Sequence, residues 1–167
     1  VFYRQARYTL NGKVFNIYKF RSMIVDAEKD GKSQPATDHD PRITPVGRVL
    51  RATRLDELPQ LIDILIGNMS LVGPRPERIE HVDKYSEDIP EFKYRLKVRG
   101  GLTGYAQLYG KYNTSPYDKL QLDLIYIQNY SIFLDIRLIF MTLKIMFMKE
   151  STEGFSEQQK NELQEKR

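Results

Sequence analysis

The sequence contains no cysteine and only two histidines among its 167 residues. Without cysteine, the chain has no thiol nucleophile, no thiolate zinc site and no disulfide bond. A histidine-based triad or zinc site would have to use His39 or His81, and neither the GxSxG nor the HExxH motif occurs. These absences argue against the common serine, cysteine and zinc hydrolases.

Long apolar segments are missing as well. No run of about eighteen apolar residues occurs, so we expect no segment to span a bilayer, and no signal peptide is visible. The chain begins with Val1 rather than methionine, which leaves open that further chain precedes it. The length favours a single domain, which we place at residues 1–149, followed by a polar tail over residues 150–167.

Basic residues outnumber acidic ones and give a net charge of +4 and a pI near 9.2. This balance favours anionic partners such as nucleic acid, nucleotide phosphates or anionic lipid headgroups. No nucleic-acid-binding motif is recognised and carboxylates interrupt the basic residues, so we expect no nucleic-acid partner. A basic, non-catalytic module that binds anionic lipid or nucleic acid is kept as the alternative to an enzyme.

The start of the chain predicts a β-hairpin. Residues 2–10 and 13–21 are rich in aromatic and β-branched residues. They are joined by Asn11-Gly12, two residues that tolerate the positive φ angles of a tight turn. Further along, Thr44-Pro45 predicts an N-cap and a helix that continues through Leu55.

The rest of the chain is predicted to be mainly helical. After Asp56 the apolar spacing is helical up to Gly67-Asn68, a pair typical of a helix end. Residues 131–148 are apolar on nearly every side, which suits either a buried core helix or a helix at the membrane interface. Other helices are predicted within 78–99 and over 115–130, an irregular loop over 27–45, and a rigid, extended turn over 70–77. Residues 100–112 are a glycine-rich stretch. The predicted class is therefore α+β, a mainly helical single domain with an N-terminal β-hairpin and amphipathic membrane-interface helices.

Asp56 and Glu57 are adjacent carboxylates that follow a basic segment, since residues 42–54 hold four arginines and no acidic residue. Pro59 fits a helix only in its first turn, so a helix is predicted to begin close to Asp56. In one interpretation Asp56 is an N-cap and Glu57 complements the helix dipole. In the other, the two acids and the arginines form a phosphoryl-transfer site with Mg²⁺, in which the aspartate attacks phosphorus. Local sequence leaves both interpretations open.

Four segments, in this order along the chain, resemble the bacterial sugar transferases, also called polyprenyl-phosphate sugar-1-phosphate transferases or monotopic phosphoglycosyl transferases. They are KFRSM (19–23), DPRITPVGRVLRATRLDELPQL (40–61), GNMSLVGPRPE (67–77) and RGGLTGYAQLYG (99–110). The likeness covers almost the whole chain, from Val1 to Met148. Because several spaced motifs agree, chance similarity is a poor explanation.

The resemblance implies a membrane-associated enzyme at the cytoplasmic face of the bacterial inner membrane. Such an enzyme moves a sugar 1-phosphate from a nucleotide diphosphate sugar, usually a UDP-sugar, to undecaprenyl phosphate, and starts a lipid-linked glycan for exopolysaccharide, capsule or O-antigen. Asp56 matches the nucleophile that forms a covalent phosphosugar and expels UMP. Glu57 completes the dyad, in metal binding or positioning, and the implied metal, Mg²⁺, is assigned to Asp56 and Glu57.

The resemblance also implies roles for six further residues. Arg51 and Arg75 stand at motif positions that suit phosphate contacts, and Arg21 and Arg42 rank below them as phosphate-binding candidates. Asp123 and Asp135 match acidic positions of the family's C-terminal part, although an aspartate close to Lys119 on a helix is more often a surface ion-pair partner.

The sequence departs from the family at its start. Family members carry a hydrophobic helix before the segment that matches Val1, and that helix enters the membrane and returns to the same face. Poor folding, homo-oligomerisation and loss of activity are the consequences expected if it is missing, while residues 131–148 would still lie on the membrane surface. A soluble sugar transferase with an ordinary acceptor is a third hypothesis.

Overall fold

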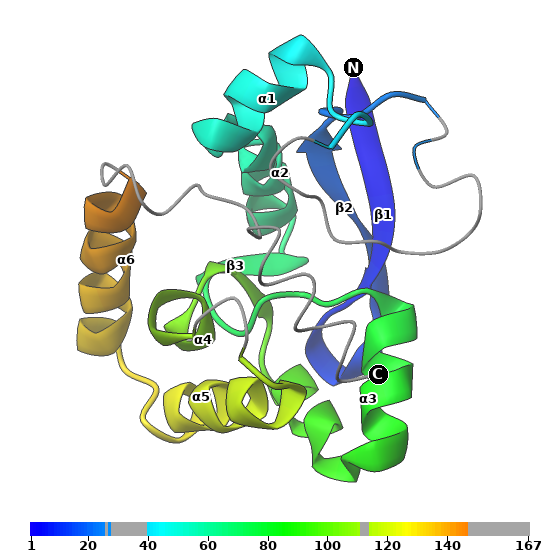
Figure 1. Ribbon diagram of the computed structural model, residues 1–167. Helices are drawn as coiled ribbons and strands as arrows, with labels where there is room; N and C mark the ends of the chain where they lie inside the picture. Colours follow the sequence, from blue (N-terminus) through cyan, green and yellow to red (C-terminus); the bar gives the residue numbers. More distant parts are fainter. Residues whose placement is uncertain (26, 28–39, 111–113, 147–167) are drawn as a thin grey trace.

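The computed structural model describes residues 1–25, 27, 40–110 and 114–146, and the structure below is that of these residues. In Figure 1 the β1–β2 hairpin stands beside α1 and α2, a short β3–β4 sheet lies in the middle, and α3 to α6 surround that sheet. The elements are β1 (Phe2–Tyr8), β2 (Val14–Phe20), α1 (Pro45–Ala52), α2 (Gln60–Leu65), β3 (Met69–Val72), α3 (Ile79–Asp88), β4 (Gly100–Thr103), α4 (Tyr105–Tyr109), α5 (Pro116–Gln128) and α6 (Ile132–Met146), with the 3₁₀-helices η1 (Leu10–Gly12), η2 (Leu55–Glu57) and η3 (Pro90–Lys97).

The predicted N-terminal hairpin is confirmed. β1 and β2 are antiparallel, in a register that pairs Phe2 with Phe20 and Tyr8 with Val14. Asn11 and Gly12 adopt φ angles of 56° and 74°, the left-handed conformation that the turn requires. The connection is longer than a two-residue turn, because it contains η1.

The helix predicted from Pro45 is also present. The side chain of Thr44 caps it by accepting a hydrogen bond from the Gly47 N–H at 2.9 Å. α1 ends at Ala52, three residues before the predicted end at Leu55. The chain leaves the helical path at Arg54, whose φ of 55° no α-helix accommodates.

The pairing of β3 with β4 was not predicted. These strands are parallel, with Met69 opposite Gly100 and Val72 opposite Thr103, in segments predicted as an extended turn and a glycine-rich stretch. Glycine in β4 allows it to approach the residue that follows β3 closely, since a Cβ on Gly101 would collide with the Gly73 backbone. Each strand is only four residues long, which is too short for a clear alternation in the sequence.

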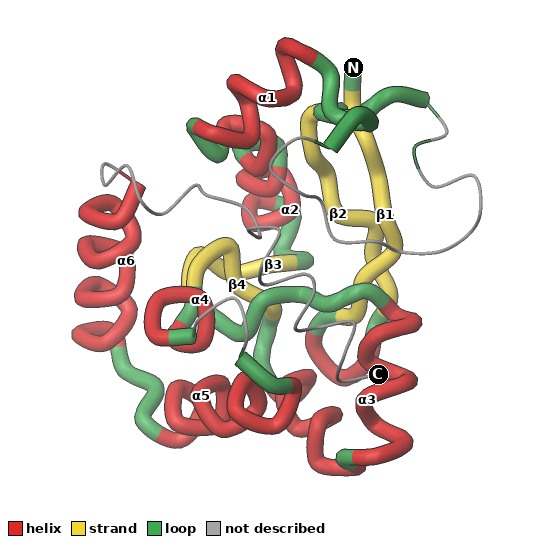
Figure 2. Tube along the Cα trace, viewed as in Figure 1, coloured by secondary structure: helices red, strands yellow, loops and turns green. Residues whose placement is uncertain are grey.

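One side of α6 is buried in the core and the other side exposes apolar side chains. Leu138 is fully buried and packs with Val72 and Tyr126. On the other side of the helix, Phe133 and Phe140 are 86% and 68% exposed. Figure 2 shows α6 at the edge of the molecule, beyond α4 and the β3–β4 sheet. In the described part of the chain, no helix combines the length and apolarity needed to cross a bilayer.

The α+β class is confirmed, with the N-terminal hairpin followed by a mainly helical chain. Most of the predicted loop over 27–45 and the whole tail over 150–167 lie outside the described residues. The placement of amphipathic helices at a membrane interface stays a prediction.

Candidate active site

Asp56 and Glu57 lie in a tight turn between two helices. After Arg54, the 3₁₀-helix η2 carries both acids, and α2 begins only at Gln60 with Pro59 as its N-terminal cap. A helix does begin close to Asp56, as predicted, but it is the short 3₁₀-helix η2. The interpretation of Asp56 as an N-cap is wrong, because Asp56 lies inside η2 and the N-cap residues of η2 and α2 are Arg54 and Pro59. A left-handed conformation at Arg54 costs about 1 kcal/mol, and such conformations are concentrated at functional sites.

Glu57 is held by two cations that come from other parts of the chain. The Nζ atom of Lys19, on β2, lies 2.8 Å from Glu57 Oε1, and Arg75 Nη2 donates a short hydrogen bond to the same oxygen. Glu57 and Lys19 are largely buried, whereas the Arg75 side chain is 37% exposed. The Arg75 side chain is therefore partly accessible to solvent while it contacts the carboxylate of Glu57.

The two carboxylates have opposite electrostatic environments. Burial raises the pKa of Glu57, but the charges of Arg75 and Lys19 outweigh it and hold that pKa well below its usual range. The pKa of Asp56 is raised, first by burial and then by the charge of Glu57, against the effects of Lys19, Arg51 and Arg75. Two neighbouring acids whose pKa values are pushed apart are typical of a site that gives them different roles.

Asp56 is also the acid that a reactant can engage. Among the described residues, none donates a hydrogen bond to its carboxylate, whereas Lys19 and Arg75 both donate to Oε1 of Glu57. Arg51, at the end of α1, is half-buried and lowers the pKa of Asp56 by its charge. The structure thus brings together four of the predicted site residues, the dyad with Arg51 and Arg75.

Two predicted phosphate-binding residues lie elsewhere in the described part of the chain. Arg21 is exposed just past the end of β2. Arg42 pairs with Asp40, with 2.6 Å between Arg42 Nη2 and Asp40 Oδ2. Neither is among the groups that contact Asp56 or Glu57 in the described residues. Their assignment to phosphate binding stays a prediction without structural support.

The C-terminal acids make structural contacts. Asp123 is buried and forms an ion pair with Arg95, with 2.6 Å between Oδ2 and Nε, so the interpretation as a surface partner of Lys119 is wrong. Asp135 accepts a hydrogen bond of 2.8 Å from the Tyr126 hydroxyl and joins α6 to α5. Lys119 pairs instead with Glu77.

The sequence model of the family described as bacterial sugar transferase matches residues 1–149 of this chain. The chain belongs to the bacterial sugar transferase family.

Three relatives whose names state a function are similar to most of this chain. A UDP-glucose:undecaprenyl-phosphate glucose-1-phosphate transferase of Klebsiella pneumoniae is 44% identical over 156 residues, covering 90% of this chain and 33% of the relative. A UDP-N-acetylgalactosamine-undecaprenyl-phosphate N-acetylgalactosaminephosphotransferase of Aeromonas hydrophila is 43% identical, covering 86% and 34%. An undecaprenyl-phosphate galactose phosphotransferase of Salmonella typhimurium is 37% identical, covering 89% and 33%. The chain thus spans about a third of the length of these relatives.

Lys19 is the site residue that sequence reasoning missed in this member of the family. It lies in the KFRSM segment, where Arg21 was selected instead. The sequence indicates its position, because alternate residues of a strand face the same side and Lys19 therefore faces the same side as Phe15 and Ile17. Both of these residues are buried. A lysine on the inward face of a hairpin needs an anionic partner, and Glu57 provides it.

The carboxylates of this family member fit the predicted Mg²⁺. Asp56 has a carboxylate that no described residue engages by a hydrogen bond, and Glu57 has a second oxygen, Oε2, besides the Oε1 that Lys19 and Arg75 contact. Mg²⁺ is commonly bound through one or two carboxylates together with waters and the phosphates of the substrate. No larger group of three or more metal-ligating side chains occurs in the described residues, so the dyad would have to rely on such external ligands.

Proposed function

We propose that the intact protein transfers a sugar 1-phosphate from a UDP-sugar to undecaprenyl phosphate through a covalent intermediate on Asp56. The observation that carries the proposal is the division of the dyad: Glu57 is fixed and ionised by two cations, while Asp56 has no hydrogen-bond partner among the described residues. The names of the relatives, which act on UDP-sugars and undecaprenyl phosphate, support the choice of donor and acceptor.

The transfer takes two displacement steps at phosphorus. In the first, an oxygen of Asp56 forms a bond to the phosphorus that carries the sugar, the bond from this phosphorus to the bridging oxygen breaks, and UMP leaves. In the second, a phosphate oxygen of undecaprenyl phosphate attacks the same phosphorus and releases the Asp56 carboxylate. The product is a polyprenyl diphosphate sugar. Splitting the transfer lets one site serve a soluble donor and a lipid acceptor in turn.

The surrounding residues assist these steps by charge and position. Arg75 and Arg51 balance the negative charge of the phosphates next to the dyad. A planar guanidinium group can donate two hydrogen bonds to one phosphate at once. Lys19 keeps Glu57 in place. When bound at the dyad, Mg²⁺ neutralises further phosphate charge. The partial exposure of Arg75 leaves it accessible to the donor.

A membrane surface is the proposed location, at the cytoplasmic face of the inner membrane. Support comes from apolar side chains that the fold leaves exposed on two regions. The first, on α1 and the α2 region, contains Val46, Val49, Leu61, Leu65 and Ile66, and the second, on α6, contains Ile132, Phe133, Ile136, Phe140 and Leu143. Exposed apolar residues on helices suit insertion into the headgroup region, where the lipid acceptor is found.

The proposal is tested on the intact protein in native membranes, incubated with a UDP-sugar and Mg²⁺. We expect UMP release and a phosphosugar mass on the peptide that contains Asp56, both lost in Asp56→Asn. Asp88→Asn, an exposed acid on α3, is the matched control and should behave as wild type. UMP release undiminished in Asp56→Asn would overturn the covalent mechanism. A screen of UDP-sugars then identifies the donor.

A different outcome would support the non-catalytic alternative. The basic chain would then bind DNA and anionic vesicles equally, and its binding to both would weaken with rising salt. UDP-sugar would not change its melting temperature. If UMP is released only with a water-soluble acceptor, and polyprenyl phosphate has no effect, the soluble transferase hypothesis is favoured.

A further inference from the structure

A buried ion pair lies behind the candidate site. Arg95, from η3, is 4% exposed and Asp123, from α5, is 1% exposed, with 2.6 Å between Nε and Oδ2. Placing both charges in the protein interior carries a large desolvation cost, and such a pair is often no more stabilising than apolar residues of the same volume. The stability of the fold alone is therefore a weak explanation for this pair.

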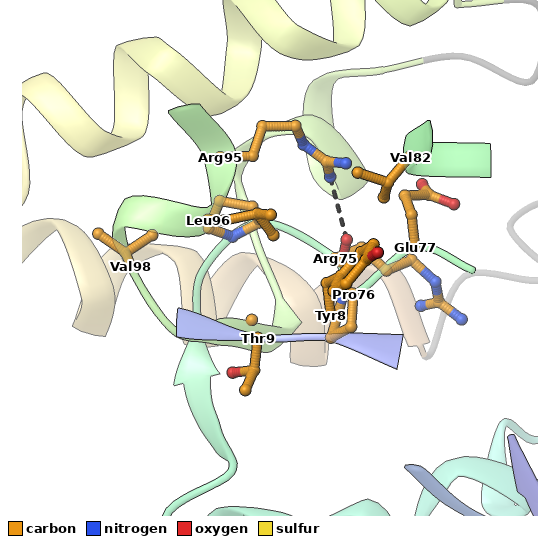
Figure 3. A pocket seen from close by; sticks show the side chains of 11 residues that line it. Tyr8, Thr9, Arg75, Pro76, Glu77, Val82, Arg95, Leu96 and Val98 are labelled. Carbon is orange, nitrogen blue, oxygen red and sulfur yellow. Dashed lines mark hydrogen bonds between the residues drawn. The ribbon is translucent and has the colours of Figure 1, made fainter. Parts of the chain in front are cut away.

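Arg95 uses the other end of its guanidinium to hold the backbone of Arg75. Its Nη2 donates a hydrogen bond of 3.0 Å to the carbonyl oxygen of Arg75, while Nε is bonded to Asp123. Figure 3 shows the Arg95 side chain reaching across a small pocket towards the Pro74–Glu77 segment. The rigid guanidinium of Arg95 thus links Asp123 on α5 to the backbone of Arg75, and the Arg75 side chain contacts Glu57.

The rest of the segment leaves Arg75 little freedom. Two prolines flank it, and a proline restricts both its own φ and the conformation of the residue before it. The Gly101 N–H donates to the Pro74 carbonyl at 2.9 Å, and a Cβ on Gly100 would collide with the Pro76 ring. With the carbonyl of Arg75 held by Arg95, the backbone is fixed on both sides and the guanidinium is directed to Glu57.

Asp123 itself has no access to a substrate. Its carboxylate is buried and bonded to Arg95. A general acid or metal ligand has to be accessible to the substrate, and the Asp123 side chain is only 1% exposed. An effect of Asp123 on the reaction must therefore pass through Arg95.

We propose that Asp123 and Arg95 are positioning residues for catalysis, which fix the guanidinium of Arg75 where it binds a phosphate of the donor. The inference rests on the proposed function for the choice of ligand. Its structural part, the control of the Arg75 side chain by Arg95, can be measured separately from turnover.

The test compares Arg95→Lys and Asp123→Asn in two backgrounds, wild type and Arg75→Gln, using the intact protein in membranes. Arg95→Lys keeps a cation beside Asp123 but removes the fork that also reaches the Arg75 carbonyl. We expect kcat/KM for the UDP-sugar to fall about 10- to 100-fold in wild type, as happens when outer-shell partners of a ligating group are removed. In the Arg75→Gln background the same changes should produce no further loss. Glu91→Gln, an exposed acid on the same element as Arg95, is the control.

The pH profile provides a readout that simple destabilisation does not move. The dyad is faced by Lys19 from β2, Arg51 from α1 and Arg75, and the Arg75 charge lowers the pKa of both acids. A displaced Arg75 therefore shifts the acid limb of kcat/KM to higher pH, and this shift should be absent with Arg75→Gln. Equal losses of kcat/KM in both backgrounds would overturn the proposal.

Two further measurements keep the result interpretable. Removing one partner of a buried pair can prevent folding, so thermal unfolding is recorded for each variant, and Arg95→Lys serves if Asp123→Asn does not fold. The ¹⁵Nε–¹Hε NMR signal of Arg75 reports its side chain without any reaction. If wild type releases no UMP but this signal still moves in Arg95→Lys, the proposed function fails while the positioning holds; an unmoved signal contradicts the positioning.

Discussion

Lys19 and Glu57, 38 positions apart in the sequence, form an ion pair in which 2.8 Å separates Nζ from Oε1. The contact joins the inward face of the N-terminal hairpin to the turn that carries the candidate nucleophile. Burial lowers the pKa of Lys19, and the charge of Glu57 raises it. The charge of Glu57 therefore stabilises the ammonium form of Lys19, and Lys19, on the hairpin, in turn holds the carboxylate in position.

Replacing Lys19 by methionine should reduce UDP-sugar turnover about tenfold or more, because Glu57 then keeps only Arg75 as a partner and loses its fixed position. UMP release at saturating donor measures the effect. Lys13→Met removes an exposed lysine from the same hairpin and should leave the rate unchanged. Similar losses in both variants would show that the charge of the hairpin, rather than this ion pair, matters.

Arg51 should set the acid limit of activity. Its charge lowers the pKa of Asp56, whose pKa is raised overall by burial and Glu57. A nucleophilic carboxylate must be ionised, so Arg51→Gln raises the pKa of Asp56 further and moves the acid limb of the pH–rate profile to higher pH. Arg48→Gln, an exposed change on the same helix, should move it far less. A shift to lower pH for Arg51→Gln would contradict the assignment.

The hydrogen bond from Tyr126 to Asp135 should contribute to stability and not to catalysis. Burial is the first cause that raises the pKa of Tyr126, and the bond to Asp135 raises it further. Tyr126→Phe removes the bond and keeps the ring, so we expect a loss of about 1 to 2 kcal/mol in the free energy of unfolding, measured by urea denaturation. Turnover per folded molecule should stay at the wild-type level. A selective loss of turnover would instead place Asp135 in the reaction.

The exposed apolar side chains of α2 and α6 should bind lipid. Leu65 is 86% exposed, and a glutamate there or at Phe140 opposes insertion into an anionic interface. Co-sedimentation of the chain with vesicles of phosphatidylglycerol and phosphatidylethanolamine measures the bound fraction, which should fall in both variants. Val14→Glu, at an exposed apolar position in the hairpin, is the control. Equal binding of all variants would count against a membrane role for these helices.

The local elements of the fold could be predicted where a few adjacent residues determine the backbone. Asn11-Gly12 indicated the hairpin, and Thr44-Pro45 indicated the start of α1. The end of α1 was predicted wrongly, since no strong helix terminator precedes Arg54 and its left-handed conformation is not a preference of arginine. The β3–β4 pair was missed because parallel pairing joins segments about thirty positions apart, with strands too short to show a period.

The candidate site was predicted only in part, because its residues come from segments that are distant in the sequence. Motif resemblance selected the dyad, Arg51 and Arg75, which the fold brings together. It ranked Arg42 below these arginines but still assigned it to phosphate binding, whereas Arg42 pairs with Asp40 in the structure. A motif preserves residue types at fixed positions, and it does not report which of several similar cations reaches a given carboxylate.

The sequence by itself determined the hairpin turn, the capped helix, the adjacent carboxylates after a basic segment, and membership of a sugar transferase family. These features depend on neighbouring residues or on motifs read along the chain. Only the tertiary structure decided that Lys19 joins the site, that Glu57 rather than Asp56 is held by cations, and that Asp123 is a buried partner of Arg95. Ion pairs between distant segments depend on the packing of whole elements, and burial then sets the pKa of each group, so neither can be obtained from local sequence.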